Sequence, residues 1–507
     1  MATATKPKTI KLTASDGSAI EFIDEIKASG GMKDVYFSPS KKYVVAFFRG
    51  KPPIGLKDRL LVITDSYRTR IFENVGGDYW KNVYCWPTSV VEHDGRIGVV
   101  VPFYDQPFFF MHGSRNNDML GIKGHEKQGK WFASANNRAK FIDPRELGDW
   151  SKHLRLCIQI SRAVRRMHSA GLAHSDLSYK NVLVDPSTGR ACLIDIDGLV
   201  VPGKYPPEVV GTPDFIAPEC VMTTHLNKDD PNRKLPCIAT DQHALAILVY
   251  MYLLYRHPLR GDKVHDLNDP QKDEEISMGA KALFVEHPLD KANSIKAANL
   301  KPSELPWKDT AKIPFTVTGP YLSALFRRAF IDGLHNPSAR PTANDWETAL
   351  VKTVDLIQPC SNTACEQEWF VFDNTTQPAC PFCGTPFHGK LPVLNLYSSQ
   401  RAGNFRPDNH RLMVYSNQSL FLWHAKLSVV PNEKITEEQK KRVGYFVFHG
   451  NKWYLVNENL PDLIDMTDND NRVSIPLSDK VELKDGQKLL LSKEAGGRLV
   501  IVQMVDA

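Results

Sequence analysis

The residues of this chain that are best suited to chemistry fall in two clusters. The first lies in "GLAHSDLSYKNVLVDPSTGRACLIDIDG" (171–198) and contains Asp176, Asn181, Asp195 and Asp197; the second is a group of four cysteines between 360 and 383. Carboxylate and amide oxygens suit a hard divalent cation, and a carboxylate can also accept a proton from a hydroxyl group. Any one of these residues alone would be an ordinary turn or capping residue, but together they form a candidate catalytic site.

Two contrasting regions must position this site. Residues from about 18 to 110 favour short strands, with one helical stretch at "LKDRLLVITDSYRTRIF". Residues from about 140 to 355 favour helices, including an apolar core helix at "ALAILVYMYLLY" that is too short to span a bilayer. A small strand-rich lobe followed by a larger helical lobe predicts an α+β arrangement with a cleft.

The order of these motifs resembles the catalytic loop, hairpin and metal-binding aspartate of the eukaryotic-type (Hanks-type) protein kinases. The resemblance implies that Asp176 accepts the substrate hydroxyl proton while Asn181 and Asp195 bind Mg²⁺ (or Mn²⁺). Lys180 could steady the γ-phosphate of ATP, although simple surface exposure explains it equally well.

Downstream motifs extend the resemblance. "GTPDFIAPE" (211–219) matches the end of a kinase activation segment, in which Thr212 would line the peptide site. The resemblance also implies that Asp241 anchors the catalytic loop and that Arg340 of "NPSARPT" pairs with Glu219. Since small-molecule kinases generally lack this element, the set favours a protein substrate.

The small lobe departs from the kinase pattern. "ASGGMKDVYF" stands where a glycine-rich loop would be, so Gly30 and Gly31 are candidates to cover the phosphates and Lys33 could add charge; a plain hairpin is the alternative. The strand "YVVAFFRG" should carry the lysine that binds the phosphates, but Phe48 stands at that position. The nearest cation is Arg49, which strand alternation could direct to the wrong face.

Three further positions bear on nucleotide binding and regulation. The backbone from Val101 to Tyr104, including Phe103, is expected to contact the adenine. The helical stretch offers only Asp65 as a weak partner for a phosphate-binding cation. Ser175 stands where regulated kinases have an arginine, which predicts a kinase that is not activated by phosphorylation of its activation segment.

"CLIDIDG" contains two aspartates that could hold the metal ion. Asp195 directly follows the apolar strand, and its distance from Asn181 is closer to the usual spacing, so we assign the metal to Asp195. Asp197 then replaces the glycine of the usual Asp-Phe-Gly, with Ile196 in the aromatic position, and could support the metal site indirectly.

The cysteine cluster in "PCSNTACEQEWFVFDNTTQPACPFCGTPF" consists of Cys360, Cys365, Cys380 and Cys383. The tight C-P-F-C-G turn and the separation of the two pairs suit a zinc ribbon. Four thiolates close a tetrahedral Zn²⁺ site, so the zinc should be structural. A redox dithiol and a chance grouping are the alternatives.

Beyond residue 390 closely spaced strand signals predict a small all-β sandwich. "FLWHAKLSVV" resembles part of a forkhead-associated domain, but the serine and arginine expected before His424 are Phe421 and Leu422. Phosphopeptide binding is therefore doubtful, and a module for packing or protein docking is the alternative.

These features predict a multidomain α+β chain: a bilobal protein-kinase-like fold followed by the zinc ribbon and the β-sandwich. We place a flexible tail at 1–17, the kinase domain at 18–355 (small lobe 18–104, large lobe 105–355), the ribbon at 356–389 and the β-module at 390–507. This order resembles the bacterial kinase of the tellurium-resistance-associated signalling triads, which implies a von Willebrand-type TerY protein and a metal-dependent phosphatase as partners.

Composition sets limits on the remaining function classes. The formal charge of +5 over 507 residues is too small to suggest nucleic acid as a partner, and no apolar leader precedes the first motif. We therefore expect a cytoplasmic protein without a membrane or nucleic-acid partner. The main hypothesis is an ATP- and Mg²⁺-dependent serine/threonine kinase; the alternatives are a pseudokinase scaffold and a small-molecule phosphotransferase.

Overall fold

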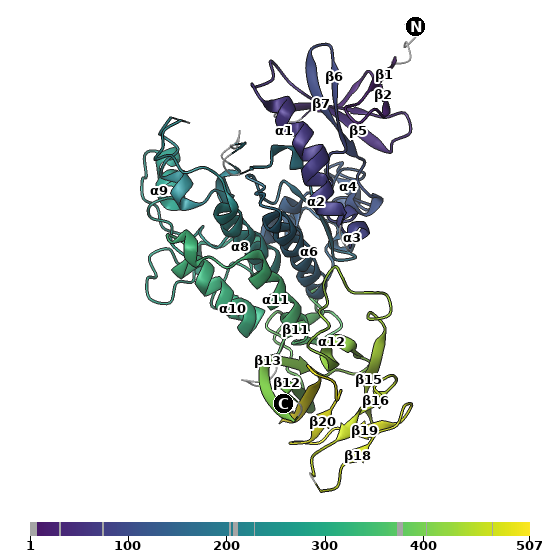
Figure 1. Ribbon diagram of the computed structural model, residues 1–507. Coiled ribbons are helices and arrows are strands. Elements are labelled where there is room, and N and C mark those ends of the chain that lie inside the picture. Colours follow the sequence, from purple (N-terminus) through teal and green to yellow (C-terminus); the bar gives the residue numbers. More distant parts are fainter. Residues whose placement is uncertain are drawn as a thin grey trace. The chain divides into compact units, whose positions relative to one another are not determined.

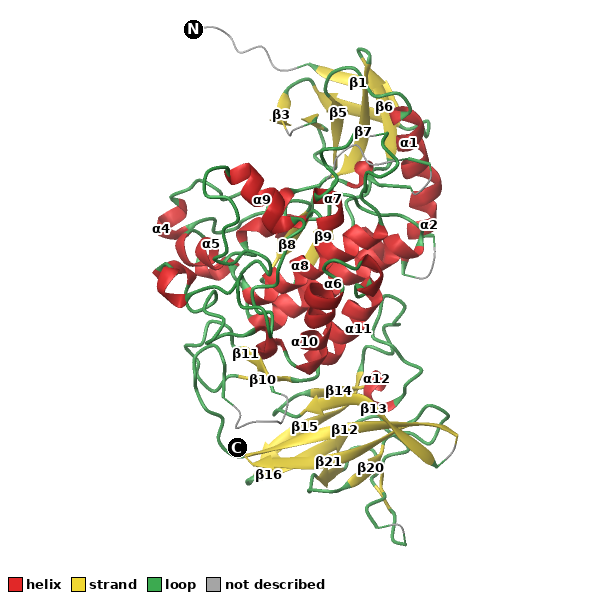
Figure 2. Ribbon diagram, turned by 90° about the vertical axis from the view of Figure 1, so that its left-hand side faces the viewer, coloured by secondary structure: helices red, strands yellow, loops and turns green. Residues whose placement is uncertain are grey.

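The computed structural model describes residues 8–29, 32–73, 76–201, 204–205, 211–227, 229–372, 379–401, 403–468 and 470–506. The chain divides into two compact units. The first comprises Met1–Gly148, Arg155–Asp309 and Phe326–Glu347, and the second comprises Asp149–Leu154, Thr310–Leu325 and Thr348–Ala507. Figure 1 labels many of the elements of both units, and Figure 2 distinguishes helices from strands.

The strands of the first unit form an antiparallel five-stranded sheet in the order β3-β4-β5-β7-β6 and two hairpins, β1-β2 and β8-β9. Their bounds are β1 (Thr9–Thr13), β2 (Ala19–Ile23), β3 (Ile26–Ser29), β4 (Lys33–Phe37), β5 (Tyr43–Phe48), β6 (Ser89–His93), β7 (Arg96–Pro102), β8 (Val182–Asp185) and β9 (Arg190–Leu193).

Strand β1 corrects the prediction of a flexible tail at 1–17 for its own residues, Thr9–Thr13, whereas residues 1–7 lie outside the described part of the chain. Its residues alternate between exposed and half-buried, and it pairs along its whole length with β2. Ile10 and Leu12 pack against the cluster around Phe22, so apolar alternation has recruited this segment into the small lobe.

The five-stranded sheet buries a different apolar cluster on each face because its strands alternate. Val45 and Phe47 join one cluster, whereas Ala46 and Phe48 join another that also includes Leu60 of the helical stretch. That stretch consists of α1 (Leu56–Val62), a π-helical turn (Ile63–Tyr67) and α2 (Arg68–Phe72), as its periodicity predicted.

The large lobe is mostly helical. Its longest helices are α6 and α8, and α8 is buried over most of its length, as the apolar run predicted. Besides α1 and α2, the helices that begin in or pass through the first unit are α3 (Gly77–Lys81), α4 (Arg115–Asp118), α5 (Ala135–Lys140), α6 (Trp150–Ser169), α7 (Pro218–Val221), α8 (Ile238–Leu254), α9 (Pro270–Met278), α10 (Pro320–Arg327) and α11 (Ala343–Val354).

The second unit contains two larger sheets and a short hairpin, β10-β11. A six-stranded sheet has the order β13-β12-β21-β20-β17-β18, and a four-stranded sheet has the order β14-β15-β16-β19. The elements are β10 (Ile357–Pro359), β11 (Trp369–Val371), β12 (Lys390–Arg401), β13 (Asn404–Met413), β14 (Ser419–Phe421), α12 (Leu422–Ala425), β15 (Arg442–His449), β16 (Lys452–Asn457), β17 (Ile464–Asp465), β18 (Val473–Ser474), β19 (Lys480–Glu482), β20 (Lys488–Leu490) and β21 (Arg498–Asp506).

One apolar core serves both of these sheets. Val393 and Leu412 of the six-stranded sheet belong to the same buried cluster as Phe446 and Leu455 of the four-stranded sheet. In the described part of the chain, no helix combines the length and the hydropathy that crossing a membrane requires.

Candidate active site

The loop that follows α6 is held in place by Asp241 of α8. Its carboxylate accepts hydrogen bonds from the backbone amides of His174 (2.7 Å) and Ser175 (3.3 Å), and it lies 3.2 Å from Nε2 of His168. Asp241 is buried, and Ser175 has a positive φ of 71°. A buried carboxylate that accepts two backbone N–H bonds fixes a strained turn, so the structure places Asp241 under the loop.

Asp176 is the centre of a hydrogen-bond network. Its Oδ1 accepts bonds from the amide (2.6 Å) and the hydroxyl (2.8 Å) of Thr212, and its Oδ2 accepts a bond of 2.9 Å from the Asn181 amide group. Gly211, which precedes Thr212, has a φ of 119° that other residues rarely adopt. The structure therefore joins the catalytic loop to the "GTPDF" segment at Asp176.

Asp195 lies where strand β9 ends and a 3₁₀ turn, Ile196–Gly198, begins. It has left-handed backbone angles (φ 60°, ψ 42°), a conformation that is uncommon for residues other than glycine. The amide of Ile194, immediately before it, donates to the carbonyl of Asn181 at 3.0 Å. Asn181 and Asp195, the two predicted metal ligands, thus come from adjacent, bonded segments.

A lysine from the small-lobe sheet completes the cluster. Nζ of Lys33 lies 2.6 Å from Oδ1 of Asp195 and 2.8 Å from both carboxylate oxygens of Asp197. Lys33 stands on β4 directly opposite Phe48 of β5, and its ammonium group lies 5.4 Å from the centre of the Phe48 ring. A cation therefore lies beside Phe48, on the residue that pairs with it across the two strands.

The three charged groups of this cluster change one another's pKa values. Burial opposes the charge on Lys33, but the carboxylates of Asp197 and Asp195 outweigh it and raise the pKa of the lysine. Burial likewise opposes the charge on Asp195, yet the nearby Lys33 holds the pKa of this carboxyl below its ordinary value. For Asp197, burial is only partly offset by Lys33, and its pKa is raised. The cluster is thus an interdependent electrostatic unit.

Other candidates for phosphate binding have different positions. Arg49 does not join the cluster: its Nε binds Asp34 at 2.8 Å, and Asp34 alternates with Lys33 on the strand, so Arg49 lies on the other face. Gly30 and Gly31 lie outside the described residues. Lys180 is exposed and, among the described residues, has no ion-pair partner, which leaves both interpretations of it open.

Amides in the segment expected to contact the adenine are already engaged in the small-lobe sheet. The amide of Phe103 donates to the carbonyl of Lys42 at 3.0 Å. By the alternation of an antiparallel ladder, the Val101 amide bonds to its partner Val44, so neither amide is a free donor. Tyr104 follows the end of the strand, and its amide donates to no other group within the described residues.

The predicted ion pair at the end of the activation segment is bidentate. Nη1 and Nη2 of Arg340 lie 2.7 Å from the two carboxylate oxygens of Glu219. The guanidinium also donates to the backbone carbonyls of Gly333, Ala239 and Leu334, and only 1% of the Arg340 side chain is exposed. Each hydrogen-bonding direction of this arginine is used.

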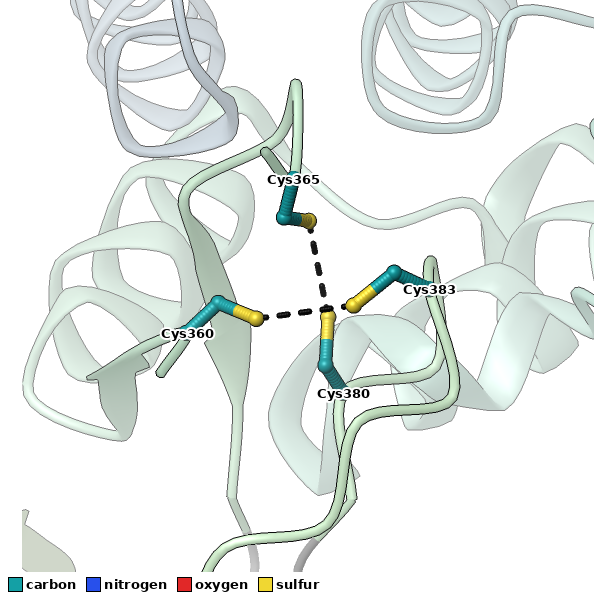
Figure 3. A group of neighbouring side chains, drawn as sticks. All are labelled: Cys360, Cys365, Cys380 and Cys383. Atoms are coloured by element: carbon teal, nitrogen blue, oxygen red, sulfur yellow. Dashed lines mark hydrogen bonds between the residues drawn. The ribbon is translucent and has the colours of Figure 1, made fainter. Parts of the chain in front are cut away.

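The four cysteines converge on one point from two loops (Figure 3). Their sulfur atoms lie within 4.8 Å of one another, with 3.5 Å between Cys360 and Cys383 and 3.8 Å between Cys365 and Cys380. Tetrahedral Zn²⁺ with Zn–S bonds of about 2.3 Å requires sulfur separations of about 3.8 Å, whereas a disulfide requires about 2.05 Å. The donor set fits Zn²⁺.

Backbone geometry explains why these cysteines meet. The amide of Cys360, directly after β10, bonds to the carbonyl of Glu368 at 2.7 Å, and that of Cys380 bonds to Thr385 at 2.9 Å. Gly384 has a φ of 74°, which closes the turn after Cys383. The glycine after the second pair therefore permits the turn that the sequence predicted.

The sequence predicted only that Lys33 could add charge near the phosphates. It also predicted that Asp195 binds the metal ion and that Asp197 supports the metal site indirectly. The signal for Lys33 was its position opposite Phe48, which requires the register of two strands. The signal for Asp197 was its spacing two residues after Asp195. The sequence does not say which of the two carboxylates Lys33 reaches, because that depends on how the two lobes pack.

Comparisons with known proteins agree with this geometry. Residues 129–344 match the family model described as the protein kinase domain. The chain is 33% identical over 107 residues to death-associated protein kinase dapk-1 of Caenorhabditis elegans, covering 20% of this chain and 7% of that protein. It is 26% identical over 211 residues to the probable serine/threonine-protein kinase fhkA of Dictyostelium discoideum, covering 37% of this chain and 32% of that protein.

Among solved structures, the chain is similar to ROP2 from Toxoplasma gondii, described as a virulence factor with a protein-kinase fold and no enzymatic activity. The identity is 14% and the TM-score 0.39, over 70% of this chain and 86% of that one; a score this low carries no weight for fold or activity. The family model and the curated relatives support a Hanks-type protein kinase domain. The chain spans a third or less of the length of the curated relatives given above.

Proposed function

We propose that this chain is an ATP- and Mg²⁺-dependent serine/threonine kinase that transfers the γ-phosphoryl group of ATP to a hydroxyl group of a protein. The observation that carries the proposal is the meeting of Lys33 and Asp195 at 2.6 Å, beside the loop that holds Asp176 and Asn181. This arrangement supplies a cation for phosphate, ligands for a divalent metal ion and a carboxylate for the acceptor hydroxyl.

Each residue has a role that its chemistry permits. Asp176 orients the acceptor hydroxyl and takes its proton; the hydroxyl of Thr212, which donates to Oδ1 at 2.8 Å, demonstrates that this oxygen accepts such a bond. Asn181 and Asp195 would hold Mg²⁺, which neutralises charge on the transferring group when bound. Lys33 would bind phosphate oxygens by charge-assisted hydrogen bonds.

The remaining nucleotide contacts rest on the backbone. The Tyr104 amide would donate to the adenine, and Gly30 and Gly31 would cover the phosphates. A protein substrate is supported by "GTPDFIAPE", whose Glu219 is bound to Arg340. Lys180 would lie near the γ-phosphate.

The C-terminal half would serve structure and recruitment. We propose that Cys360, Cys365, Cys380 and Cys383 bind a structural Zn²⁺ ion in a ribbon at 356–389. Residues 390–507 would form a forkhead-associated-like β-sandwich, which their shared apolar core supports. The resemblance to the tellurium-resistance-associated kinases supports a bacterial signalling role with a TerY protein and a metal-dependent phosphatase as partners.

Incubation of the purified protein with γ-labelled ATP, Mg²⁺ and a generic protein substrate such as casein, or with the protein's own hydroxyl groups as acceptors, tests the kinase. Transfer is expected in the wild type, and Asp176→Asn should abolish it while ATP still binds. ATP binding without any transfer, also when candidate partners are added, would instead identify a pseudokinase scaffold. Rapid turnover on a small metabolite with no protein labelled would identify a small-molecule phosphotransferase.

A further inference from the structure

The partner that holds Lys33 comes from an unexpected place. The kinase resemblance leads one to expect it on the helical stretch Leu56–Phe72, whose two acidic residues are Asp58 and Asp65. Both of these are exposed. Asp197 instead places both carboxylate oxygens 2.8 Å from the lysine Nζ, and only 7% of its side chain is exposed.

We propose that Asp197 is the positioning residue for Lys33, and that it takes the place of a carboxylate on the helix. The inference rests on the proposed function, because it concerns how the phosphate-binding cation of that site is kept in place. Asp197 does not contact the reacting atoms in this arrangement; it acts through Lys33.

The division of work between the two aspartates follows from their surroundings. Asp195 is 48% exposed in its side chain and is the candidate metal ligand, so binding of a metal ion would draw its carboxylate away from Lys33. An ammonium group in a largely enclosed site needs a remaining counter-charge. Asp197 supplies it with both oxygens, and the three N–H donors of Lys33 leave one direction for a phosphate oxygen.

The turn that carries Asp197 is fastened to the catalytic loop. The hydroxyl of Ser175, which precedes Asp176, donates to the carbonyl of Gly198 at 3.2 Å. Val200 and Ala173 exchange two backbone hydrogen bonds of 2.9 and 3.2 Å. Through Asp197, the position of Lys33 is therefore fixed relative to the large lobe and the loop of Asp176. It does not depend on the helical stretch Leu56–Phe72.

Ser175 thus has a structural use at a position where regulated kinases have an arginine. A side chain that binds the turn of Asp197 couples the loop of Asp176 to the cation site. The consequence is a site whose phosphate-binding cation is held in place without a carboxylate on the helix.

A double-mutant cycle tests the pairing. ATP affinity, measured by calorimetry without Mg²⁺, and kcat and KM are determined for the wild type, Lys33→Met, Asp197→Asn and the double variant. If Asp197 acts through Lys33, Asp197→Asn alone should weaken ATP binding by about 10-fold, in the range expected for a charge-assisted contact, and should add nothing once Lys33 is methionine.

Asp65→Asn is the matched control. It makes the same substitution as Asp197→Asn, but at an exposed aspartate of the helical stretch instead of the buried one. It should change ATP affinity by less than about 2-fold in either background, which is the scatter expected for independent sites. Thermal unfolding verifies that each variant is folded. If Asp197→Asn proves unstable, Asp197→Glu is measured in its place. This variant keeps the charge and should retain part of the ATP affinity.

The outcomes separate this inference from the proposed function. Additive effects of Lys33→Met and Asp197→Asn, or an effect of Asp65→Asn as large as that of Asp197→Asn, would overturn the pairing even if the wild type transfers phosphate. Coupled ATP affinities in a wild type that transfers no phosphate would refute the kinase activity and leave the pairing in place.

Discussion

Replacing Arg340 by methionine should expose how much the end of the activation segment depends on one side chain. The change removes two charge-assisted bonds to Glu219 and three bonds to backbone carbonyls. It also leaves the Glu219 carboxylate without its counter-charge. Only 19% of the Glu219 side chain is exposed, so water compensates this loss only in part. Removing one partner of such a buried pair costs about 3–5 kcal/mol.

Hydrogen exchange of the segment from Gly211 to Val221 is the suitable assay, since unfolding of a chain with two compact units is not a single transition. We expect the free energy of opening in this segment to fall by about 3–5 kcal/mol in Arg340→Met. Arg340→Lys should recover only part of the loss, because a lysine keeps the charge but cannot form the fork.

Arg145→Met is the matched control. Arg145 also forms a bidentate pair, with Asp143, but 65% of its side chain is exposed. Its removal should cost far less than the removal of Arg340, because solvent screens an exposed ion pair. If Arg340→Met cost as little as Arg145→Met, the argument from burial and saturated hydrogen bonding would be wrong.

Three further results are expected. Lys33→Met should reduce kcat/KM by at least about 10-fold, the loss of a charge-assisted phosphate contact, whereas Arg49→Met should stay within about 2-fold, since Arg49 binds on the other face of the sheet; equal losses would contradict the assignment. Elemental analysis should find one Zn²⁺ per chain, and strong chelation or Cys383→Ser should release it and unfold the cysteine loops, which circular dichroism and exchange would detect. Burial lowers the pKa of His257 to about 4. Its ring accepts a hydrogen bond from the Leu259 amide and donates one to the Asp214 carbonyl, so the imidazole is neutral in the folded state. The unfolded state takes up its proton first as the pH falls, so the free energy of unfolding of the first unit should decline between about pH 6.5 and 4, by about 3 kcal/mol from this group. His257→Gln, followed at each pH by the midpoint of the transition in which the first unit unfolds, should flatten that decline, and an unchanged slope would refute the argument.

The sequence by itself determined the local parts of this protein. Asp176 and Asn181 are five residues apart in one loop, and the hairpin to Asp195 is short, so their proximity follows from chain connectivity. The cysteine pairs and the buried helix α8 were predictable for the same reason: each signal lies within one stretch of chain. The family-model match over 129–344 falls on the region with these local motifs.

What the tertiary structure decided were the contacts between segments far apart in the chain. Lys33 reaches Asp195 across 162 positions, and its choice over Arg49 depends on strand register and on which face each side chain takes. Within the described residues, the amide of Tyr104 donates to no other group, and this likewise depends on where pairing with β5 ends. Alternation along a strand is visible in a sequence, but the partner strand, its register and the carboxylate it faces are set by packing, where a shift of one residue reverses every side chain.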